Sequence, residues 1–153
     1  MRLVIWCAAA VAATVRGVGA GKIYAAGSGQ DMMSLPETVA EIMDLSGVAS
    51  PHLLYIGTAT YDEQAAKDTQ THAFTDAGCS VSTLDLAYAN ATEQEIESAV
   101  AGADIVLVSG GNTLFAVDRW NKLGVPSVLR HALDNGTVLC GGSAGGIVWF
   151  DGG

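Results

Sequence analysis

The stretch DIVLVSGG, residues 104–111, decides how the rest of the chain is interpreted. Its central residues, Ile105 to Val108, are all apolar, and two glycines follow shortly after them. An unbroken apolar run of this length is typical of a strand in a parallel sheet that is covered by helices on both faces. Glycine directly after such a strand lets the backbone come close to a ligand. The stretch therefore predicts a buried parallel strand that ends in a candidate functional loop.

The same alternation of short apolar runs and amphipathic stretches extends from Lys22 to the end of the chain. It indicates repeated strand and helix units. The pattern predicts a doubly wound α/β fold with a mostly parallel sheet, right-handed crossovers and a ligand site beyond the carboxyl ends of the strands. We expect strands at 22–29, 52–59, 80–87, 104–111 and 137–142, and helices near 35–46, 63–77, 92–102, 112–123 and 126–135.

Local signals mark several helix ends. The sequence Thr92-Glu93-Gln94-Glu95 is a capping box, in which the hydroxyl and the last carboxylate each satisfy a free amide at a helix start. Gly78 and Gly136 follow predicted helices at positions where a left-handed residue stops them. These signals agree with the apolar periodicity.

Composition limits the classes of function. The chain has 153 residues, the length of one ordinary domain, and 16 acidic against 7 basic side chains give a formal net charge of -9. A nucleic acid or an anionic membrane surface is therefore a poor partner. The three cysteines Cys7, Cys79 and Cys140 form neither a disulfide framework nor a zinc-site spacing, so we expect buried free thiols.

The first twenty residues differ from the rest, because they hold two arginines, no acidic residue and an apolar run from Leu3 to Val15. They resemble a signal peptide cleaved after Ala20 and are too short to span a membrane stably. A stray upstream extension is the alternative. We therefore divide the chain into residues 1–20 and an α/β domain at 21–153, and a true signal would imply secretion or organelle targeting.

The second Gly-rich strand end, CGGSAGG at 140–146, places Ser143 between Gly141 and Gly145 in the pattern G-x-S-x-G. In a nucleophile turn, a serine stands on a sharp strand-to-helix corner, and small residues two before and two after it let neighbouring backbone pass. Amides just after such a serine can hold an oxyanion. A turn used only for close packing of strand against helix is the alternative interpretation.

The loop Ser109-Gly110-Gly111-Asn112-Thr113 would lie beside Ser143 if strands 104–111 and 137–142 are neighbours. The amide of Gly111 could then supply a second oxyanion donor. Asn112 can also serve simply as the N-cap of the next helix, and the two roles are compatible.

Together, IVLVSGGNTLFAVDRWNKLGV and VLCGGSAGGIVWF resemble the peptidase E family, the alpha-aspartyl dipeptidases, which carry a GGNT loop and a G-x-SAG turn at this separation. KIYAAGSGQ and LLYIGTAT extend the resemblance toward the N-terminus. It implies a cytoplasmic serine peptidase on the flavodoxin-like fold shared with class I glutamine amidotransferases, acting on short peptides such as those with an N-terminal aspartate, and needing no cofactor or metal. By match to the motifs, Ser143 would be the nucleophile, Gly111 and Ala144 would give the oxyanion amides, and the supporting loops would comprise Gly110, Asn112, Thr113, Gly141, Gly142 and Gly145.

The pattern departs from the family at the base. A serine needs a base to take its proton, and the family places the acid and the histidine downstream of the nucleophile. His52, His72 and His131 all precede Ser143, and each is better explained as a surface or core residue; Asp151 is the only acid that follows it. We therefore expect either a fragment that lacks the C-terminal part of the fold, and has little activity by itself, or a degenerate form.

Two other functions stay open. A non-catalytic binding or assembly subunit would keep the fold without the chemistry. A nucleotide-binding module is suggested by Gly17-Val18-Gly19-Ala20-Gly21-Lys22, but Arg16 replaces the first glycine of a phosphate loop and Ile23 replaces its Ser or Thr. Gly27-Ser28-Gly29 lacks the third glycine of a dinucleotide motif, where Met32 stands. An aspartyl preference would need a cation, and no motif places Arg119 or Lys122 in that role.

Overall fold

The computed structural model describes residues 2–6 and 21–151. These residues fold around a sheet of six parallel strands. The strands lie in the order β1-β2-β6-β5-β3-β4, and every neighbouring pair is parallel. This confirms the predicted α/β fold with a parallel sheet. The strands are β1 (Arg2–Trp6), β2 (Lys22–Ala26), β3 (His52–Ile56), β4 (Ser80–Thr83), β5 (Ile105–Val108) and β6 (Val138–Gly142).

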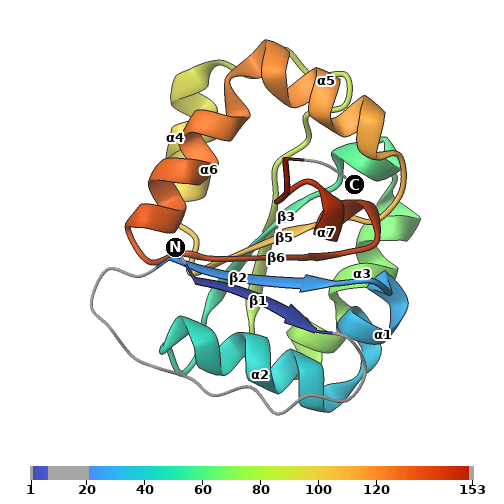
Figure 1. The fold of residues 1–153 in the computed structure, drawn as a ribbon, viewed down its shortest axis with the longest axis vertical. Coiled ribbons are helices and arrows are strands. Elements are labelled where there is room, and N and C mark those ends of the chain that lie inside the picture. Colours follow the sequence, from blue (N-terminus) through green and yellow to red (C-terminus); the bar gives the residue numbers. More distant parts are fainter. Residues whose placement is uncertain (1, 7–20, 152–153) are drawn as a thin grey trace.

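Helices cover both faces of the sheet (Figure 1). One face carries α1 (Gly29–Ser34), α2 (Pro36–Ser46) and α3 (Gln64–Asp76), and the other carries α4 (Glu93–Ala101), α5 (Thr113–Leu123) and α6 (Val125–Asp134). A short 3-10 turn, η1 (Thr58–Thr60), follows β3, and α7 (Ala144–Ile147) follows β6.

The core has two layers because side chains alternate across each strand. In β5, Val106 and Val108 pack with the helices α4 to α6, whereas Ile105 and Leu107 pack with α1 to α3. All four residues are fully buried. The continuous apolar run is thus explained, since both faces of this strand are covered.

The observed elements differ from the expected ones mainly at strand ends. The strand expected at 22–29 ends at Ala26, because Ser28 caps α1 by accepting a hydrogen bond from the Asp31 amide, 3.2 Å away. The strand expected at 80–87 ends at Thr83. β1 was not expected; it pairs with β2 from Arg2↔Lys22 to Trp6↔Ala26.

Residues 7–20 lie outside the described residues, so the interpretation of 1–20 as a signal or extension stays a prediction. The same holds for Cys7 and for most of the phosphate-loop-like segment. Lys22 is described, and its ammonium donates to the carbonyl of Leu45.

The predicted helix ends are confirmed. Thr92 and Glu95 form the reciprocal capping box at the start of α4. Gly78 and Gly136 have φ of 101° and 98°, in the region that favours glycine. Cys79 and Cys140 are buried free thiols, and desolvation by burial raises the pKa of Cys79 to about 11.

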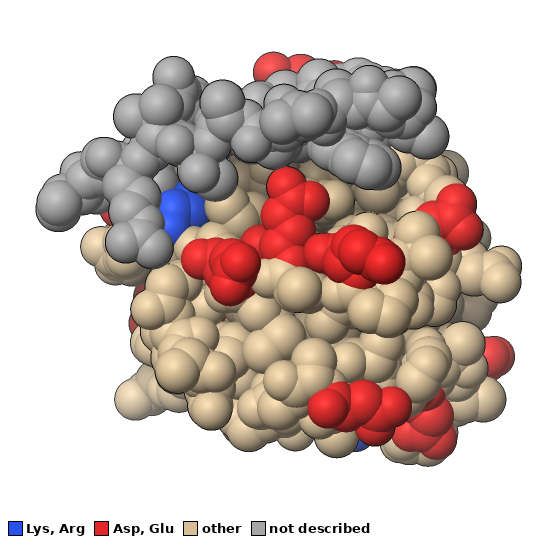
Figure 2. All heavy atoms as spheres, turned by 90° about the horizontal axis from the view of Figure 1, so that it is seen from below, with Lys and Arg blue, Asp and Glu red and all other residues tan. Residues whose placement is uncertain are grey.

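Acidic side chains are more prominent than basic ones on the face seen in Figure 2, in keeping with the net charge of the chain. Within residues 2–6 and 21–151, no helix combines the length and apolarity that a membrane crossing requires.

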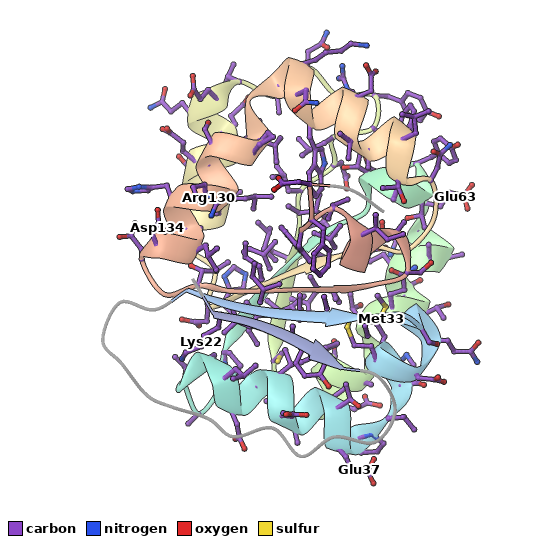
Figure 3. All side chains as sticks on the ribbon, in the orientation of Figure 1. Lys22, Met33, Glu37, Glu63, Arg130 and Asp134 are labelled. Carbon is purple, nitrogen blue, oxygen red and sulfur yellow. The ribbon has the colours of Figure 1, made fainter. Side chains whose placement is uncertain are left out.

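The two ends of the strands define two edges of the sheet. We call the loops after β2, β3, β5 and β6 the carboxyl edge, and the residues just before the strands the amino edge. Figure 3 shows Met33 and Glu63 toward the carboxyl edge and Lys22 and Asp134 toward the amino edge.

Candidate active site at the carboxyl edge

The two Gly-rich loops meet because their strands are neighbours. β5 pairs with β6, with Val108 opposite Gly141, and β6 pairs with β2, with Ala26 opposite Gly142. All three strands therefore end at nearly the same level. This places the loop that follows β5 on one side of Ser143 and the loop that follows β2 on the other.

Ser143 occupies a strained corner between β6 and α7. Its backbone has φ 55° and ψ -124°, which an L-residue rarely adopts. Its amide donates to the carbonyl of Ala26 at 3.0 Å, and its own carbonyl accepts from Gly146 and Ile147. The corner turns the residue outward: Ser143 is exposed, and its hydroxyl has no hydrogen-bond partner among the described residues.

The glycines around Ser143 are required by close backbone contacts. A Cβ on Gly141 would lie 2.2 Å from the carbonyl oxygen of Gly145, and a Cβ on Gly145 would lie 2.2 Å from that of Val108. A Cβ on Gly142 would lie 2.4 Å from the Cα of Gly29. No side chain fits at these positions, because the neighbouring atoms belong to the backbone and cannot rotate away.

The loop after β5 lies beside the serine, as the sequence predicted for neighbouring strands. The position for a Cβ on Gly110 is 3.6 Å from the Cβ of Ser143. Gly111 has φ 124°, and a Cβ on it would lie 2.3 Å from the carbonyl oxygen of Ala59. The amide of Asn112 donates to that same carbonyl at 2.7 Å. The backbone of η1 therefore fixes the path of this loop.

Asn112 performs the capping role expected from the sequence. Its Oδ1 accepts from the amide of Phe115 at 3.1 Å, at the start of α5. Its Nδ2 donates to the hydroxyl of Tyr61 at 2.9 Å. Thr113 is the first residue of α5. Asn112 thus ties the loop to α5 and also to the turn after β3.

Two amides at this edge are available for a ligand. Among the described residues, neither the amide of Gly111 nor that of Ala144 donates a backbone hydrogen bond. Ala144 is the first residue of α7, where amides point away from the helix body. Such amides can stabilise an oxygen that gains negative charge.

The three histidines lie away from Ser143. His52 begins β3 at the amino edge, where its Nδ1 lies 2.7 Å from the carbonyl oxygen of Gly102 and its Nε2 lies 2.8 Å from the hydroxyl of Ser82. His72 is exposed on α3, with Nδ1 2.8 Å from the carbonyl of Thr69. His131 is exposed in the latter half of α6.

His131 lines a groove of about 790 Å³ between α4 and α6, next to the starts of β5 and β6. That groove is at the amino edge. The structure therefore does not bring any histidine of the chain to the candidate nucleophile, and Asp151 lies just beyond α7, exposed.

The turn after β3 belongs to the site, although no sequence motif marked it. Tyr61 and Asp62 both have φ of 58°, two consecutive left-handed residues. Asp62 accepts a hydrogen bond from the amide of Ala87 at 2.6 Å, and its other carboxylate oxygen is buried without a partner in the described residues. Desolvation by burial, followed by the charge of Asp85, raises the pKa of Asp62.

Buried polar contacts hold η1 against α5. The indole nitrogen of Trp120 donates to the hydroxyl of Thr58 at 3.0 Å, and both side chains are buried. Ala59, Ala116 and Ala144 form a small buried cluster that joins η1, α5 and α7. Their small size lets three elements approach closely at the site.

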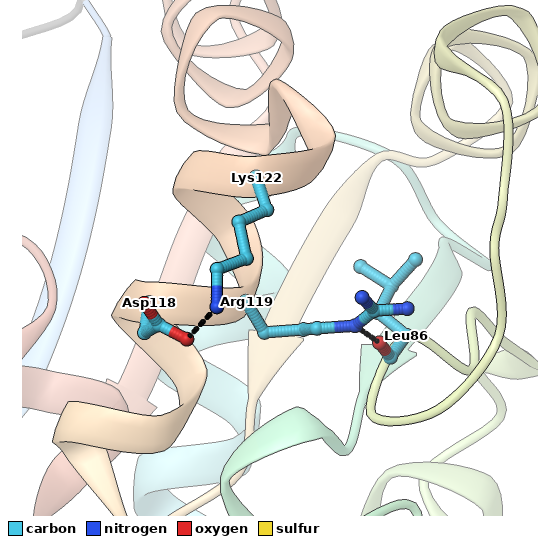
Figure 4. Close-up of polar contacts among 4 residues, drawn as sticks. All are labelled: Leu86, Asp118, Arg119 and Lys122. Carbon is cyan, nitrogen blue, oxygen red and sulfur yellow. Dashed lines mark hydrogen bonds and ion pairs between the residues drawn. The ribbon is translucent and has the colours of Figure 1, made fainter.

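The cations of α5 are already engaged (Figure 4). Arg119 donates to the carbonyl of Leu86 at 2.8 Å and also to the carbonyl of Ala89. Lys122 forms an ion pair with Asp118 one turn earlier, with an N–O distance of 2.6 Å. Arg119 therefore anchors the loop after β4, and Lys122 serves the polar face of its helix. No cluster of three potential metal ligands occurs within residues 2–6 and 21–151.

A comparison with protein-family models assigns this chain to one family. The model of Peptidase family S51 matches residues 23–153. The chain belongs to this family. The match confirms the predicted resemblance to peptidase E, and it covers both Gly-rich loops and the serine turn between β6 and α7.

Two curated relatives carry peptidase names. The chain is 34% identical over 110 residues to "Uncharacterized peptidase YgaJ" of Bacillus subtilis (strain 168), covering 72% of this chain and 47% of that protein. It is 27% identical over 130 residues to "Uncharacterized peptidase PM1590" of Pasteurella multocida (strain Pm70), covering 83% and 59%. This S51 chain thus spans about half to three fifths of the length of these relatives.

Two solved structures share the fold. A "Putative Peptidase E Protein" from Listeria monocytogenes EGD-e superposes with a TM-score of 0.68 at 22% identity, covering 84% of this chain and 62% of that one. A peptidase from an acI-B1 Actinobacterium superposes with a TM-score of 0.73 at 21% identity, covering 87% and 58%. At these identities the likeness supports the fold alone.

Proposed function

We propose that this S51 chain carries the nucleophile and the oxyanion amides of a serine peptidase that cleaves short peptides through an acyl-enzyme on Ser143. The observation that carries the proposal is the exposed Ser143 hydroxyl on a strained strand-to-helix corner with φ 55°, beside a second Gly-rich loop. Membership of a peptidase family and the names of the curated relatives support peptide hydrolysis.

In the proposed reaction, the hydroxyl oxygen of Ser143 attacks the carbonyl carbon of a peptide bond. The carbonyl oxygen gains negative charge and accepts hydrogen bonds from the amides of Gly111 and Ala144. The C–N bond then breaks, the amine leaves with a proton, and an ester on Ser143 remains. Water hydrolyses the ester and restores the hydroxyl.

A base must accept the serine proton in the first step and return it to the leaving amine. His52 and His72 contact protein oxygens away from this site, and His131 lines a groove at the amino edge. We therefore expect the 153-residue chain by itself to show little or no turnover of dipeptides. Normal turnover by this chain would mean that one of these histidines reaches Ser143 after all.

Labelling of the natural protein with a fluorophosphonate tests whether Ser143 is the nucleophile. We expect one adduct, located on Ser143 by peptide mass spectrometry, and its loss in Ser143→Ala. Ser28→Ala is the matched control, because Ser28 is also an exposed serine at the carboxyl edge and should leave labelling unchanged. Labelling that survives Ser143→Ala, or no labelling of the natural protein, would overturn the proposal.

A non-catalytic binding or assembly subunit is the second candidate. The placement of the histidines favours it, since a nucleophile without a base is nearly inert. Peptide binding without any fluorophosphonate labelling would support this candidate over the peptidase.

A further inference from the structure

The turn after β3 has a costly backbone conformation that its neighbours hold in place. Tyr61 and Asp62 are consecutive left-handed residues, each with φ of 58°. Residues other than glycine keep such a conformation only where surrounding contacts fix it. Here the Asp62 amide donates to the carbonyl of Gly57 at 3.1 Å, and the Asp62 carboxylate accepts from the amide of Ala87 at 2.6 Å. These contacts fix the point from which the side chain of Tyr61 projects.

The side chain of Tyr61 joins this turn to the start of α5. Its hydroxyl accepts a hydrogen bond from Nδ2 of Asn112 at 2.9 Å. Its ring contacts that of Phe115, with centroids 4.8 Å apart and an interplanar angle of 54°, a favourable tilted arrangement. Tyr61 is nevertheless 39% exposed, so burial in a core does not explain its position.

Asn112 is held by three hydrogen bonds. Its Oδ1 accepts from the amide of Phe115, its backbone amide donates to the carbonyl of Ala59, and its Nδ2 donates to Tyr61. Among the described residues, the Tyr61 hydroxyl is the one acceptor for Nδ2. Removal of this hydroxyl would therefore leave the donor without its protein partner and loosen the side chain of Asn112.

The orientation of the Gly111 amide depends on what holds Asn112. The peptide group that carries this amide lies between Gly110 and Gly111, and neither residue has a side chain to restrict its rotation. Its N–H donates no backbone hydrogen bond among the described residues. The following peptide group is held, because the Asn112 amide donates to the carbonyl of Ala59 at 2.7 Å. The contacts of Asn112 and of η1 therefore restrain the Gly111 amide.

We propose that Tyr61 is a positioning residue for the Gly111 amide. Its hydroxyl holds Asn112, and Asn112 keeps that amide in one orientation in the loop beside Ser143. A donor that stabilises an oxyanion is most effective when it is fixed before the reaction begins. The inference rests on the proposed function for the use of the amide, but the orientation of the amide can be measured without any reaction.

The rate of fluorophosphonate labelling of the natural protein tests this role. The phosphoryl oxygen of the reagent gains negative charge as Ser143 attacks, as the carbonyl oxygen of a peptide would. Tyr61→Phe removes the hydroxyl and keeps the ring that contacts Phe115. We expect the rate constant at saturating reagent to fall about 5-fold, the size expected when one neutral hydrogen bond is lost. The reagent concentration that gives half of the maximal rate should not change.

Tyr88→Phe is the matched control. The ring of Tyr88 also contacts Phe115, at 6.2 Å and 53°, but its hydroxyl has no hydrogen-bond partner among the described residues. This variant should be labelled at the rate of the natural protein, and both variants should keep its Tm. An unchanged rate in Tyr61→Phe, or an equal fall in Tyr88→Phe, would overturn the role of the Tyr61 hydroxyl.

A double-mutant cycle tests whether Tyr61 acts through Asn112. Asn112→Ser keeps an oxygen that can cap α5, but its side chain is too short to reach the Tyr61 hydroxyl. We expect this variant to be labelled about 5-fold more slowly or less. The addition of Tyr61→Phe should slow it no further, because both changes remove the same hydrogen bond. Two effects that multiply would contradict the proposed path through Asn112.

Amide NMR spectra separate this inference from the proposed function. In Ser143→Ala, which cannot react, Tyr61→Phe should shift or broaden the resonance of Gly111. The resonance of Ala144 should stay unchanged, because Ala144 belongs to α7. An unchanged Gly111 resonance would refute the positioning role and leave the peptidase intact. A changed resonance in a protein whose natural form is never labelled would refute the peptidase and keep the control of the Gly111 amide by Tyr61.

Discussion

At the amino edge of the sheet, both ring nitrogens of His52 are within hydrogen-bond distance of protein oxygens, whereas at the carboxyl edge the Ser143 hydroxyl has no partner in the described residues. The two edges also differ in backbone crowding. Gly145 at the carboxyl edge has no room for a Cβ, while Gly102 near the amino edge has ordinary contacts of 3.8 Å or more.

The two edges therefore differ in what they contribute to stability and to ligand binding. At the amino edge, the contacts of the His52 ring with protein oxygens contribute to stability. The carboxyl edge holds Ser143 in a strained backbone conformation, which costs stability, and leaves its hydroxyl exposed to a ligand. Four substitutions test this difference between the two edges.

The largest effect should come from Gly145→Ala. Its Cβ would lie 2.2 Å from the carbonyl oxygen of Val108, so β5 and α7 must separate. We expect a loss of about 3 kcal/mol or more in the free energy of unfolding. Gly102→Ala is the control, with an expected change below about 1 kcal/mol. Urea denaturation of both variants compares them, and equal losses would show that crowding does not distinguish the two edges.

The second effect concerns the amino edge. His52→Leu removes a side chain that contacts the carbonyl of Gly102 and the hydroxyl of Ser82. We expect a loss of about 1 kcal/mol in the free energy of unfolding, because the partly buried Ser82 hydroxyl and the exposed Gly102 carbonyl each lose a hydrogen bond. Fluorophosphonate labelling of Ser143 should be the same in His52→Leu as in the natural protein. A loss of labelling in folded His52→Leu would instead give His52 a role in catalysis.

The third effect has the opposite sign. Ser143→Gly should increase the free energy of unfolding by about 1 kcal/mol, because glycine adopts the φ of 55° without the strain of a side chain. The same change removes the hydroxyl and should abolish labelling. Thermal unfolding measures the gain. A stability equal to or lower than that of the unaltered protein would mean that the corner stores no strain.

The smallest effect is a dependence on pH at Asp62. Burial raises its pKa in the folded state above the ordinary value of 3.8, so the folded state holds its proton more tightly than the unfolded state. The contribution of Asp62 is therefore absent below pH 3.8 and becomes destabilising as pH rises through the folded pKa. The stability of the unaltered protein relative to Asp62→Asn should fall as pH increases from about 3 to 7.

Urea denaturation across this pH range measures the difference between the two proteins. Glu95→Gln gives the comparison of opposite sign, because the backbone hydrogen bond from Thr92 lowers the pKa of Glu95. The unaltered protein should gain stability relative to Glu95→Gln as pH rises toward 4.5, and the gain should be complete above that pH. A rise rather than a fall for Asp62 would show that its hydrogen bond from Ala87 outweighs its burial.

The sequence alone determined the features that depend on near neighbours along the chain. The alternation of apolar runs indicated the parallel sheet, Thr92 and Glu95 indicated a helix start, and Gly78 and Gly136 indicated helix ends. The match of both Gly-rich loops to one family is also local, and the family model confirms it. These signals are readable because capping, turns and periodicity act over a few residues.

Which loops lie together depends on long-range contacts. Neighbouring β5 and β6 bring Gly110 to Ser143, and the turn at Tyr61 and Asp62 joins them through Asn112, although no motif marks that turn. The ring contacts of Phe115 with Tyr61 and Tyr88 likewise join α5 with two separate loops. Strand order and long-range packing set these contacts, and a pattern within one short segment of sequence predicts neither of them.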